Sequence, residues 1–379
     1  MNAPAHIDPY RKILFVGGGS GGHFYPLIAI AEEFNTHTTR PELYYAGPDE
    51  YDAEALRTEG IRFISITSGK QRRYNSFLNF LDIFKVAIGT CSALVKLFIL
   101  YPDVVVSKGG YTSVPVVFAA GLLRIPIIVH ESDSVIGKAN RFALHFAQHI
   151  ITAYENVPLP ETKAVQHTLG IPIRTVLHTQ ASATAISLLD IDPNKPVILV
   201  IGGSQGAERV NALILDSLDE LLHDYTIIHQ TGKAHFENCM ESAQILITNE
   251  EWLKHYHPVA FLNASELNDA YHLASLVISR AGSGSIYEIA LHGKPSILIP
   301  IPEEISHDQH SNAYTYARSG ATLVIEEKNL SDDLLSAEIE RIMQDSVAYT
   351  TMATAAQSFG TNHTTKEITD LITHVSIEH

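Results

Sequence analysis

A histidine directly follows a glycine-rich segment near the start of the chain, and these residue types together could do chemistry on a phosphate-bearing substrate. His23 comes directly after Gly17-Gly18-Gly19-Ser20-Gly21-Gly22, which in turn follows the apolar residues ILFV. Backbone N–H groups of a glycine-rich strand-to-helix turn can approach a phosphate closely, and the N-terminus of the next helix adds positive potential. An imidazole in the first helical turn could then contact a diphosphate or take a proton from a reacting hydroxyl group. Helix packing or capping is the alternative role, but the position after a predicted strand favours the functional one.

Two further glycine-rich segments follow apolar runs in the second half of the chain. Gly202-Gly203-Ser204-Gln205-Gly206 follows VILVI, and Arg280-Ala281-Gly282-Ser283-Gly284-Ser285 follows ASLVIS. One such turn alone would be a weak indication, because glycine-rich turns are common. One in the first half and two in the second indicate two Rossmann-like halves around a cleft of the size that a nucleotide-sugar needs.

The elements that must position these turns are short apolar runs that alternate with helix-like stretches in both halves. Such alternation predicts parallel strands joined by crossover helices, and hence the α/β class. At 379 residues the chain is too long for one ordinary core. We therefore predict two Rossmann-like parallel-sheet domains facing a cleft, over residues 1–170 and 171–349, joined through Val157–Pro172. A C-terminal helix over about residues 350–379 is hypothesised to pack back onto the first domain.

The composition excludes several classes of protein. With 45% hydrophobic and 18% charged residues, the chain has the composition of a folded protein. A formal net charge of −16 argues against general nucleic-acid binding, which relies on a basic surface. Cys91 and Cys239 have no metal-ligand spacing and are expected to be reduced thiols. The N-terminus lacks the apolar stretch of a signal peptide, and polar residues break the longest apolar region, Phe77–Tyr101, so we expect no spanning helix.

Further short motifs run in order along most of the chain, from near residue 12 to about residue 320. Together with the first glycine-rich segment and the following His23-Phe-Tyr-Pro26, they resemble the MurG family, the lipid-linked N-acetylglucosaminyltransferases of peptidoglycan synthesis in glycosyltransferase family 28. The resemblance implies a GT-B fold, UDP-N-acetylglucosamine (UDP-GlcNAc) as donor, and an inverting transfer that needs no metal and no cofactor. The motifs are Gly109-Gly-Tyr111-Thr-Ser-Val-Pro115, His130-Glu131, Gly170-Ile-Pro172-Ile-Arg174, Gly202–Ala207, His229–Gly232, Ser279–Glu288, and Gln309 with Asn312-Ala313.

The activity that the resemblance implies is transfer of GlcNAc to the 4-hydroxyl of MurNAc in a polyprenyl-diphosphate-linked MurNAc-pentapeptide (lipid I). The product would be lipid II, made at the cytoplasmic face of the cell membrane by a peripheral protein. By resemblance, Glu288 accepts from the ribose hydroxyls, the segment at Leu262 reads the uracil, and Gln309 contacts the sugar hydroxyls. The implied donor-binding residues are Ser20, Gly21, Gly22, Asp133, Arg174, Ser204, Gln205, Leu262, Ser283, Gly284, Ser285, Ile286, Tyr287, Glu288 and Gln309.

Three residues of the first half are candidates for the catalytic base. His23 is the first candidate for base or acceptor orienter, with Glu131 and Asp133 as rivals, and the sequence does not choose among them. The family usually reads Glu-Gln-Asn where this chain has Glu131-Ser132-Asp133, and it usually has His or Gln where this chain has Asp308. A carboxylate at Asp133 can accept but not donate a hydrogen bond, which leaves other UDP-sugars open as donors. Residues implied to face the acceptor are Gly18, Gly19 and Tyr111.

A stretch that is both basic and apolar stands out in an otherwise acidic chain. Lys70–Tyr101 combines five basic side chains with aromatic and aliphatic ones, which is typical of docking on an anionic membrane surface. Some of these residues must be helix core, so we expect Leu94–Leu100 to be buried and Arg72–Phe84 to face lipid. In the family this region reaches the polyprenyl-diphosphate acceptor. The implied membrane-contacting residues are Arg72, Arg73, Phe77, Phe80 and Phe84.

A metal site is a weaker interpretation of the 20 histidines. His255-x-His257 and His307-x-x-His310 are the closest pairs, but the chain has no H-E-x-x-H motif and no cysteine near them. We therefore expect surface or loop histidines and no metal.

Three other functions stay open. A GT-B transferase could use another UDP-sugar or another lipid acceptor, such as diacylglycerol. An NAD(P)-dependent oxidoreductase is possible because Gly17, Gly19 and Gly22 satisfy G-x-G-x-x-G, but it would leave Ser279–Glu288 unexplained. A non-catalytic nucleotide-sugar sensor would not need His23 or the membrane-facing stretch.

Overall fold

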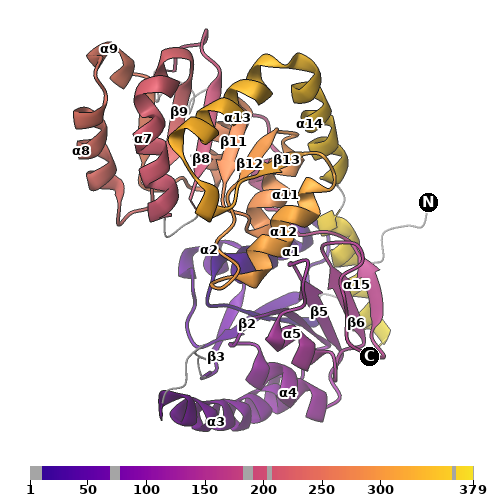
Figure 1. Cartoon of the computed structure of the whole chain (residues 1–379). Helices are drawn as coiled ribbons and strands as arrows, with labels where there is room; N and C mark the ends of the chain where they lie inside the picture. Colours follow the sequence, from indigo (N-terminus) through magenta and orange to yellow (C-terminus); the bar gives the residue numbers. More distant parts are fainter. Residues whose placement is uncertain (1–10, 69–76, 182–190, 203–206, 361–363, 379) are drawn as a thin grey trace. The chain divides into compact units, whose positions relative to one another are not determined.

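The computed structural model describes residues 11–68, 77–181, 191–202, 207–360 and 364–378 (Figure 1). The chain forms two compact units, Met1–Thr175 with Asn362–His379, and Val176–Thr361. The sequence analysis put the division after residue 170, whereas the first unit extends to Thr175. One reason is local, because the Thr175 N–H donates to Glu32 Oε2 in the first unit at 2.6 Å.

Seven parallel strands form the sheet of the first unit, in the spatial order β3-β2-β1-β4-β5-β6-β7. They are β1 (Lys12–Gly17), β2 (Glu42–Gly47), β3 (Arg62–Ser65), β4 (Val104–Gly109), β5 (Ile127–Glu131), β6 (His149–Thr152) and β7 (Val165–Thr168). The strand order reverses between β1 and β4, and ligands of open α/β sheets bind beyond the carboxyl ends of the strands at such a point. The helices of this unit are α1 (Gly21–Thr36), α2 (Ala53–Thr58), α3 (Phe77–Leu100), α4 (Val114–Leu122), α5 (Lys138–Ala143) and α15 (Thr364–Glu378).

Both faces of this sheet are buried, as the continuous apolar run of β1 predicts. Side chains of a strand alternate between the two faces, so Ile13 and Phe15 pack with α1 and α15, whereas Leu14 and Val16 pack with α3 and α4. The sheet therefore lies between two helical layers, which leaves the carboxyl ends of β1 and β4 as its chemically useful edge.

The second unit repeats this plan with six parallel strands in the order β10-β9-β8-β11-β12-β13. The strands are β8 (Val197–Ile201), β9 (Thr226–Gln230), β10 (Tyr256–Val259), β11 (Ala274–Ser279), β12 (Ser296–Leu298) and β13 (Thr322–Val324). Its order reverses between β8 and β11, the strands that two of the glycine-rich segments follow. The helices are η1 (Thr175–His178), α7 (Glu208–Asp224), α8 (Phe236–Leu246), α9 (Glu250–Leu253), α10 (Ala264–Leu273), α11 (Ser283–Leu291), α12 (His307–Ala317), η3 (Glu327–Asn329), α13 (Asp332–Gln344) and α14 (Ser346–Phe359). Two parallel sheets flanked by helices confirm the predicted α/β class.

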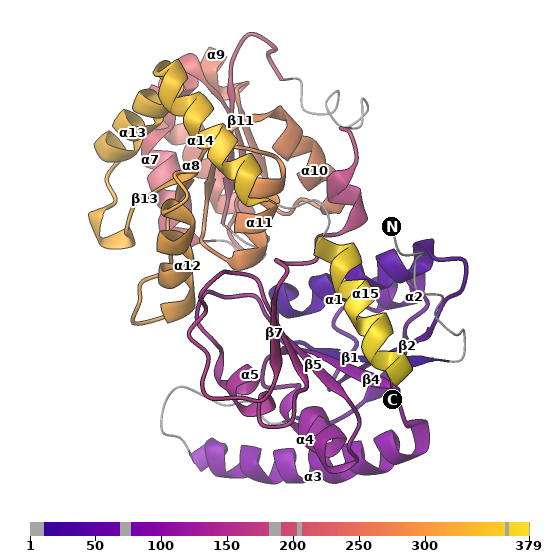
Figure 2. The ribbon, with the colours of Figure 1, turned by 90° about the vertical axis from the view of Figure 1, so that its right-hand side faces the viewer.

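The C-terminal segment contributes one helix to each unit instead of the single helix expected over about residues 350–379. Helix α14 packs on α11 in the second unit, and α15 packs on α1 in the first (Figure 2). Gly360 follows α14, and a Cβ there would lie 2.8 Å from the carbonyl group of Ala290. The chain can pass this close to α11 only because residue 360 is glycine.

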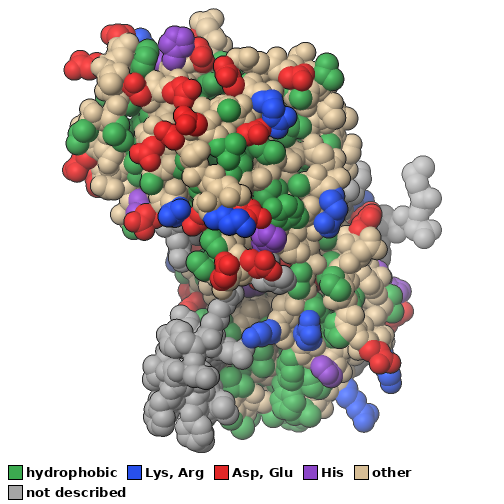
Figure 3. Space-filling model, viewed as in Figure 1, with side chains coloured by type: hydrophobic (Ala, Val, Ile, Leu, Met, Phe, Trp, Pro, Cys, Tyr) green, Lys and Arg blue, Asp and Glu red, His purple; other side chains and the backbone are tan. Residues whose placement is uncertain are grey.

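Helix α3 differs from the expectation that Leu94–Leu100 is buried. Ala93 and Leu97 are fully buried, but Val95, Phe98 and Ile99 are 61%, 70% and 77% exposed. The reason is helical periodicity, because residues on opposite sides of one helix cannot all face the same core. Hydrophobic side chains gather at the lower end of the first unit in Figure 3, over α3 and α4. Across the described part of the chain, the helices are too short or too polar to span a bilayer.

Candidate functional site

The β1–α1 turn leaves the start of helix α1 open. Ser20 is the N-cap residue, but its hydroxyl does not cap the helix; it lies 2.9 Å from Nδ1 of His23. A Cβ at Gly22 would meet no atom within 4 Å, so there is open space beside this glycine. The first N–H groups of α1 are thus in the state in which a helix N-terminus binds anions.

A second glycine turn, after β4, packs directly against the first. Gly110 has φ of +78°, and a Cβ there would lie 2.9 Å from the Gly18 carbonyl oxygen and 3.5 Å from Nδ1 of His23. Only glycine combines this positive φ with room for the Gly18 carbonyl group and the His23 ring. The ring of Tyr111 reaches the opposite side, because a Cβ on Gly19 would lie 2.8 Å from it. The structure thus brings Gly18 and Gly19, two predicted acceptor-facing residues of the first turn, against the second turn, where Gly110 contacts Gly18 and Tyr111 contacts Gly19.

The environment of His23 favours its uncharged form. Desolvation by burial, followed by the charge of Lys108, lowers the pKa of His23 from 6.5 to about 4, and Asp133 opposes this shift. A neutral imidazole has one nitrogen lone pair that can accept a proton. At neutral pH this side chain therefore has the protonation state that a general base needs.

Glu131, a rival candidate for the base, is held by its own loop. It is almost fully buried, and its two carboxylate oxygens accept from the N–H groups of Asp133 and Gly137 and from Nδ2 of Asn140, at 2.9 to 3.0 Å. Burial and the charge of Asp133 raise the pKa of Glu131. These bonds tie the Glu131 carboxylate to the loop between β5 and α5.

Sequence reasoning assigned no role to Lys108, which lies at the centre of this site. Lys108 is 1% exposed, and its ammonium group donates to Nδ1 of His130 at 2.7 Å and to Oγ of Ser132. The signal was a single lysine in the apolar run VVVSKGG. A lone lysine in a strand-like sequence does not by itself indicate a site, because edge strands often carry one.

Arg174, a predicted donor contact, belongs to the first unit. Its guanidinium group lies 4.6 Å from the centre of the Tyr25 ring, a cation–π distance. The Tyr25 hydroxyl donates to Asp52 at 3.3 Å. These contacts hold the guanidinium group of Arg174 beside α1.

In the second unit, helix α11 begins at the predicted phosphate-binding turn. Its N-cap is Gly282, so no side chain caps the helix, and Cβ atoms at Gly282 or Gly284 would meet nothing within 4 Å. Ser283 is buried at the first helical position, and Ser285 is half-buried. The open N-terminus of a nine-residue helix next to free space is suited to a phosphate group.

Two predicted donor residues on α11 have side chains that face the interior. Ile286 is fully buried, and the ring of Tyr287 packs on that of Phe359 with centroids 5.3 Å apart. Any contribution of Ile286 and Tyr287 to donor binding would come from their backbone groups.

Glu288, one turn into α11, is half-buried and fixed in position. It accepts from the hydroxyl of the fully buried Tyr271 at 3.2 Å. The Tyr271 ring stacks on that of His292, with centroids 4.7 Å apart. Tyr271 is therefore a supporting residue that sequence reasoning missed, since an isolated tyrosine in a helix carries no motif signal.

Leu262 and Gln309 each form a hydrogen bond within the second unit through one polar group. The Leu262 N–H donates to Oε1 of Gln230 at 3.0 Å, and Oε1 of Gln309 accepts from the Ile301 N–H at 3.3 Å. The Leu262 N–H and Oε1 of Gln309 are therefore already engaged within the protein.

Arg280 ties the predicted phosphate-binding turn to its neighbours. Its guanidinium donates to the carbonyl groups of Ile299 and Pro300 at 3.1 and 3.3 Å and pairs with Glu327 at 2.7 Å. The segment before α11 is thus anchored to the residues after β12 and to η3.

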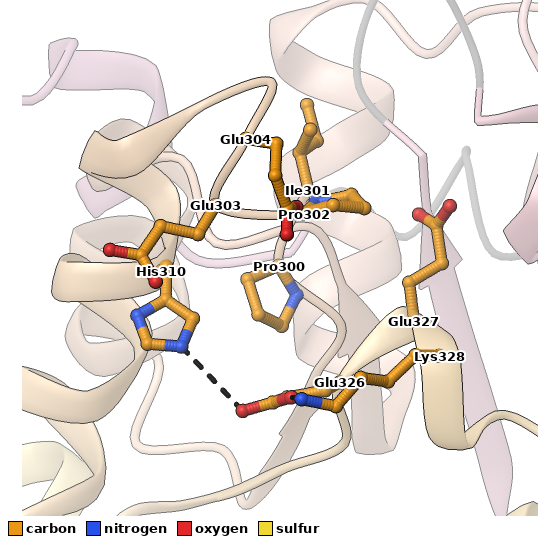
Figure 4. Close-up of a pocket in the computed structure, with 9 residues that line it drawn as sticks. All are labelled: Pro300, Ile301, Pro302, Glu303, Glu304, His310, Glu326, Glu327 and Lys328. Atoms are coloured by element: carbon orange, nitrogen blue, oxygen red, sulfur yellow. Dashed lines mark ion pairs between the residues drawn. The ribbon is translucent and has the colours of Figure 1, made fainter.

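A pocket beyond these strand ends does not suit a diphosphate (Figure 4). Four glutamates line it, against one lysine and one histidine, and His310 Nε2 lies 3.6 Å from Glu326 Oε1. This excess of carboxylates over cationic side chains repels a polyanion. Its lining residues are Pro300, Ile301, Pro302, Glu303, Glu304, His310, Glu326, Glu327 and Lys328.

Some predicted site residues cannot be placed. Ser204, Gln205, Arg72 and Arg73 lie outside the described residues. Phe77, Phe80 and Phe84 belong to α3, but their side chains lie outside the described part. Among the described residues, no group of three or more His, Cys, Asp or Glu side chains could hold a metal ion.

Comparison with protein families gives two matches that follow one another along the chain. Residues 13–152 match the glycosyltransferase family 28 N-terminal domain, and residues 197–372 match the glycosyltransferase family 28 C-terminal domain.

Two curated relatives align with nearly the whole chain. The protein from Shouchella clausii is 37% identical over 351 residues, which cover 92% of this chain and 95% of the relative. The protein from Treponema denticola is 34% identical over 337 residues, which cover 86% of each chain. Both are named UDP-N-acetylglucosamine–N-acetylmuramyl-(pentapeptide) pyrophosphoryl-undecaprenol N-acetylglucosamine transferase.

Solved structures share the fold. The crystal structure of Acinetobacter baumannii MurG superposes with a TM-score of 0.72 at 24% identity, covering 96% of this chain and 99% of that one. A UDP-GlcNAc 2-epimerase from Neisseria meningitidis, crystallised with UDP-GlcNAc, superposes with a TM-score of 0.67 at 14% identity over 97% of this chain. These likenesses confirm the GT-B fold.

Proposed function

The chain belongs to glycosyltransferase family 28, and we propose that it transfers GlcNAc from UDP-GlcNAc to the undecaprenyl-diphosphate-linked MurNAc-pentapeptide, forming lipid II for peptidoglycan synthesis. The observation that carries this proposal is the alignment of relatives with that named activity over about nine tenths of the chain. The resemblance seen in the sequence is confirmed, and membership of a glycosyltransferase family removes the oxidoreductase alternative.

The donor is proposed to bind mainly to the second unit. Its diphosphate would meet the N–H groups at the start of α11, around Ser283, Gly284 and Ser285, where no side chain caps the helix. Glu288, held by Tyr271, would accept from the ribose hydroxyls. The other proposed donor contacts are Arg174, Ser204, Gln205, Leu262, Gln309 and the backbone of Ile286 and Tyr287.

The reaction is a single displacement at the anomeric carbon of GlcNAc. The 4-hydroxyl oxygen of MurNAc forms a bond to C1 while the bond from C1 to the UDP phosphate oxygen breaks, and the configuration inverts. We assign the proton of the attacking hydroxyl to His23, whose imidazole is uncharged at neutral pH. The charge that develops on UDP would be stabilised by the N-terminus of α11.

The acceptor is proposed to meet the two glycine turns of the first unit while this unit rests on the membrane. The N–H groups at the start of α1 would hold the acceptor diphosphate beside Ser20 and Tyr111. On α3, Val95, Phe98 and Ile99 form a short exposed apolar stripe, a feature of helices that lie in a bilayer interface. We therefore infer a peripheral protein of the cytoplasmic membrane face.

The test is an assay with the purified chain, radiolabelled UDP-GlcNAc and lipid I in detergent. Labelled lipid II together with an equal amount of UDP is the expected result. Parallel reactions contain diacylglycerol as acceptor, or UDP-glucose and UDP-galactose as donors. Transfer to diacylglycerol, or faster transfer of another sugar, would replace the proposal with the other GT-B function, and donor binding without turnover would indicate a sensor.

A further inference from the structure

The ammonium group of Lys108 is buried at the end of β4, and its two observed hydrogen bonds reach the end of β5. Nε2 of His130 lies 2.9 Å from the Gly170 carbonyl oxygen, which can only accept, so Nε2 carries the imidazole proton. Nδ1 of His130 is then a lone pair and accepts from Lys108 at 2.7 Å. The tautomer of His130 is thereby fixed, and the lysine is held in place by a neutral partner.

The charges around Lys108 come from three elements. Burial lowers the pKa of Lys108 to about 8, and the charges of Glu131 and Asp133, at and after the end of β5, oppose this shift. His23, on α1, and His130 are the other titratable groups whose pKa values respond to the lysine, and both are shifted down. Two carboxylates near a turn that is open to an anion would repel it, and a single buried cation offsets that repulsion.

Lys108 and His23 also pack against neighbouring glycine residues of the two turns. A Cβ on Gly17 would lie 2.7 Å from Cβ of Lys108, and one on Gly110 would lie 3.5 Å from Nδ1 of His23. The end of β1 at Gly17 is therefore packed against Lys108 and the His23 carbonyl group, and the turn after β4 is packed against the imidazole at Gly110. A substitution at Lys108 therefore changes the environment of His23 in two ways, by removing a positive charge and by altering this packing.

We propose that Lys108 is a positioning residue of the transfer reaction, whose ammonium group holds the 131–133 segment beside the glycine-rich turn and places a positive charge near the His23 imidazole. Lys108 is buried and acts through Ser132, Asp133 and His23. The consequence for catalysis rests on the proposed function, whereas the consequence for His23 does not.

The direct test measures the titration of His23 by NMR in the full chain labelled at histidine. The His23 signal is assigned by its loss in His23→Gln. In Lys108→Met the pKa of His23 rises only partway from about 4, because burial still lowers it but a nearby positive charge has been removed. In Lys108→Arg, and in Lys163→Met, which removes an exposed lysine of the same unit, it stays low. An unchanged His23 titration in folded Lys108→Met would overturn the proposal.

Kinetics give the second readout. Lys108→Met is expected to lower kcat about tenfold to a hundredfold with little change in KM for UDP-GlcNAc, and to move the acid limb of kcat/KM to higher pH. Adding Asp133→Asn to Lys108→Met restores part of kcat, because a carboxylate left without its cation is removed. If Lys108→Met does not fold, Lys108→Gln supplies hydrogen bonds without the charge and takes its place.

The two proposals fail in different ways. An inactive wild-type chain in which Lys108 still controls the titration of His23 would contradict the proposed function alone. Full activity and an unshifted pH profile in the lysine variants would contradict the role of Lys108 alone.

Discussion

His23 can act as a base in only one of its two neutral tautomers. If the proton is on Nδ1, it is donated to the Ser20 hydroxyl oxygen 2.9 Å away, and the Nε2 lone pair is available. If Ser20 donates to Nδ1 instead, Nε2 carries the proton and can only donate. A base therefore requires the first arrangement, in which Ser20 orients the imidazole in place of capping α1.

His23→Ala is expected to lower kcat by about 10²- to 10⁴-fold while the affinity for UDP-GlcNAc stays the same, because the donor is proposed to bind elsewhere. Calorimetry with the donor and steady-state kinetics measure the two effects, with exposed His145→Ala as the matched control. In the wild type, kcat/KM should be level at neutral pH and fall as the pH drops toward 4, where the imidazole gains a proton. Equal losses in kcat and donor affinity would make His23 a binding residue.

Glu288→Gln should show the opposite pattern. A neutral amide accepts more weakly than a carboxylate from ribose hydroxyls, so the affinity for UDP is expected to fall by about tenfold. Its kcat at saturating donor should change much less. Calorimetry with UDP makes the comparison, and Glu241→Gln on the exposed side of α8 is the control. An unaltered affinity for UDP would remove Glu288 from the proposed donor site.

A candidate site residue could be predicted from the sequence where it belongs to a motif. It could not be predicted where its position depends on tertiary packing. His23 became a candidate because it directly follows a glycine-rich turn, and Glu288 because its segment resembles a motif of the family. Lys108 and Tyr271 were missed because their importance comes from partners distant in sequence, His130 and Glu288. Glu131 was predicted as a rival candidate for the base, and the hydrogen bonds that its carboxylate accepts from its own loop could not be predicted from a motif.

At the scale of the elements, helix α3 has one face that is buried against the first unit and one apolar face that is exposed. Ala93 and Leu97 anchor it to the first unit, and Ile88, Val95, Phe98 and Ile99 are exposed. Their spacing of seven, three and one residues places these four on one side of the helix. Apolarity alone did not predict which part of this segment is buried, because the period of the helix decides it.

Phe98→Asp is expected to weaken binding to vesicles containing an anionic phospholipid by about tenfold or more, since a large apolar side chain is lost from the interface and a negative charge is added. Co-sedimentation with such vesicles measures the change. Ile245→Asp, at an exposed position on α8 in the second unit, adds the same charge elsewhere and should bind like the wild type. If both variants bind equally well, α3 is not the membrane-docking element.

The whole molecule is two units of the same plan, and the sequence predicted this from the repeated order of strand, glycine-rich turn and helix. The path of the C-terminus was harder to predict, because helices α14 and α15 are both ordinary amphipathic segments. Their assignment to different units depends on contacts with α11 and α1, which no local pattern encodes. Residues 1–175 therefore complete their core only with a segment from the far end of the chain.

The first unit should accordingly lose stability when α15 is weakened. Ile372 is fully buried in the core shared by β1, α1 and α15, so Ile372→Ala is expected to cost about 2–5 kcal/mol. Hydrogen exchange of the full chain should show faster exchange in β1, β4 and α1, while β8 and β11 of the second unit keep their protection. Ile377→Ala, at an exposed position on the same helix, should leave both units unchanged. Equal loss of protection in the two units would mean that they unfold as one cooperative body, and α15 would not be a support of the first unit alone.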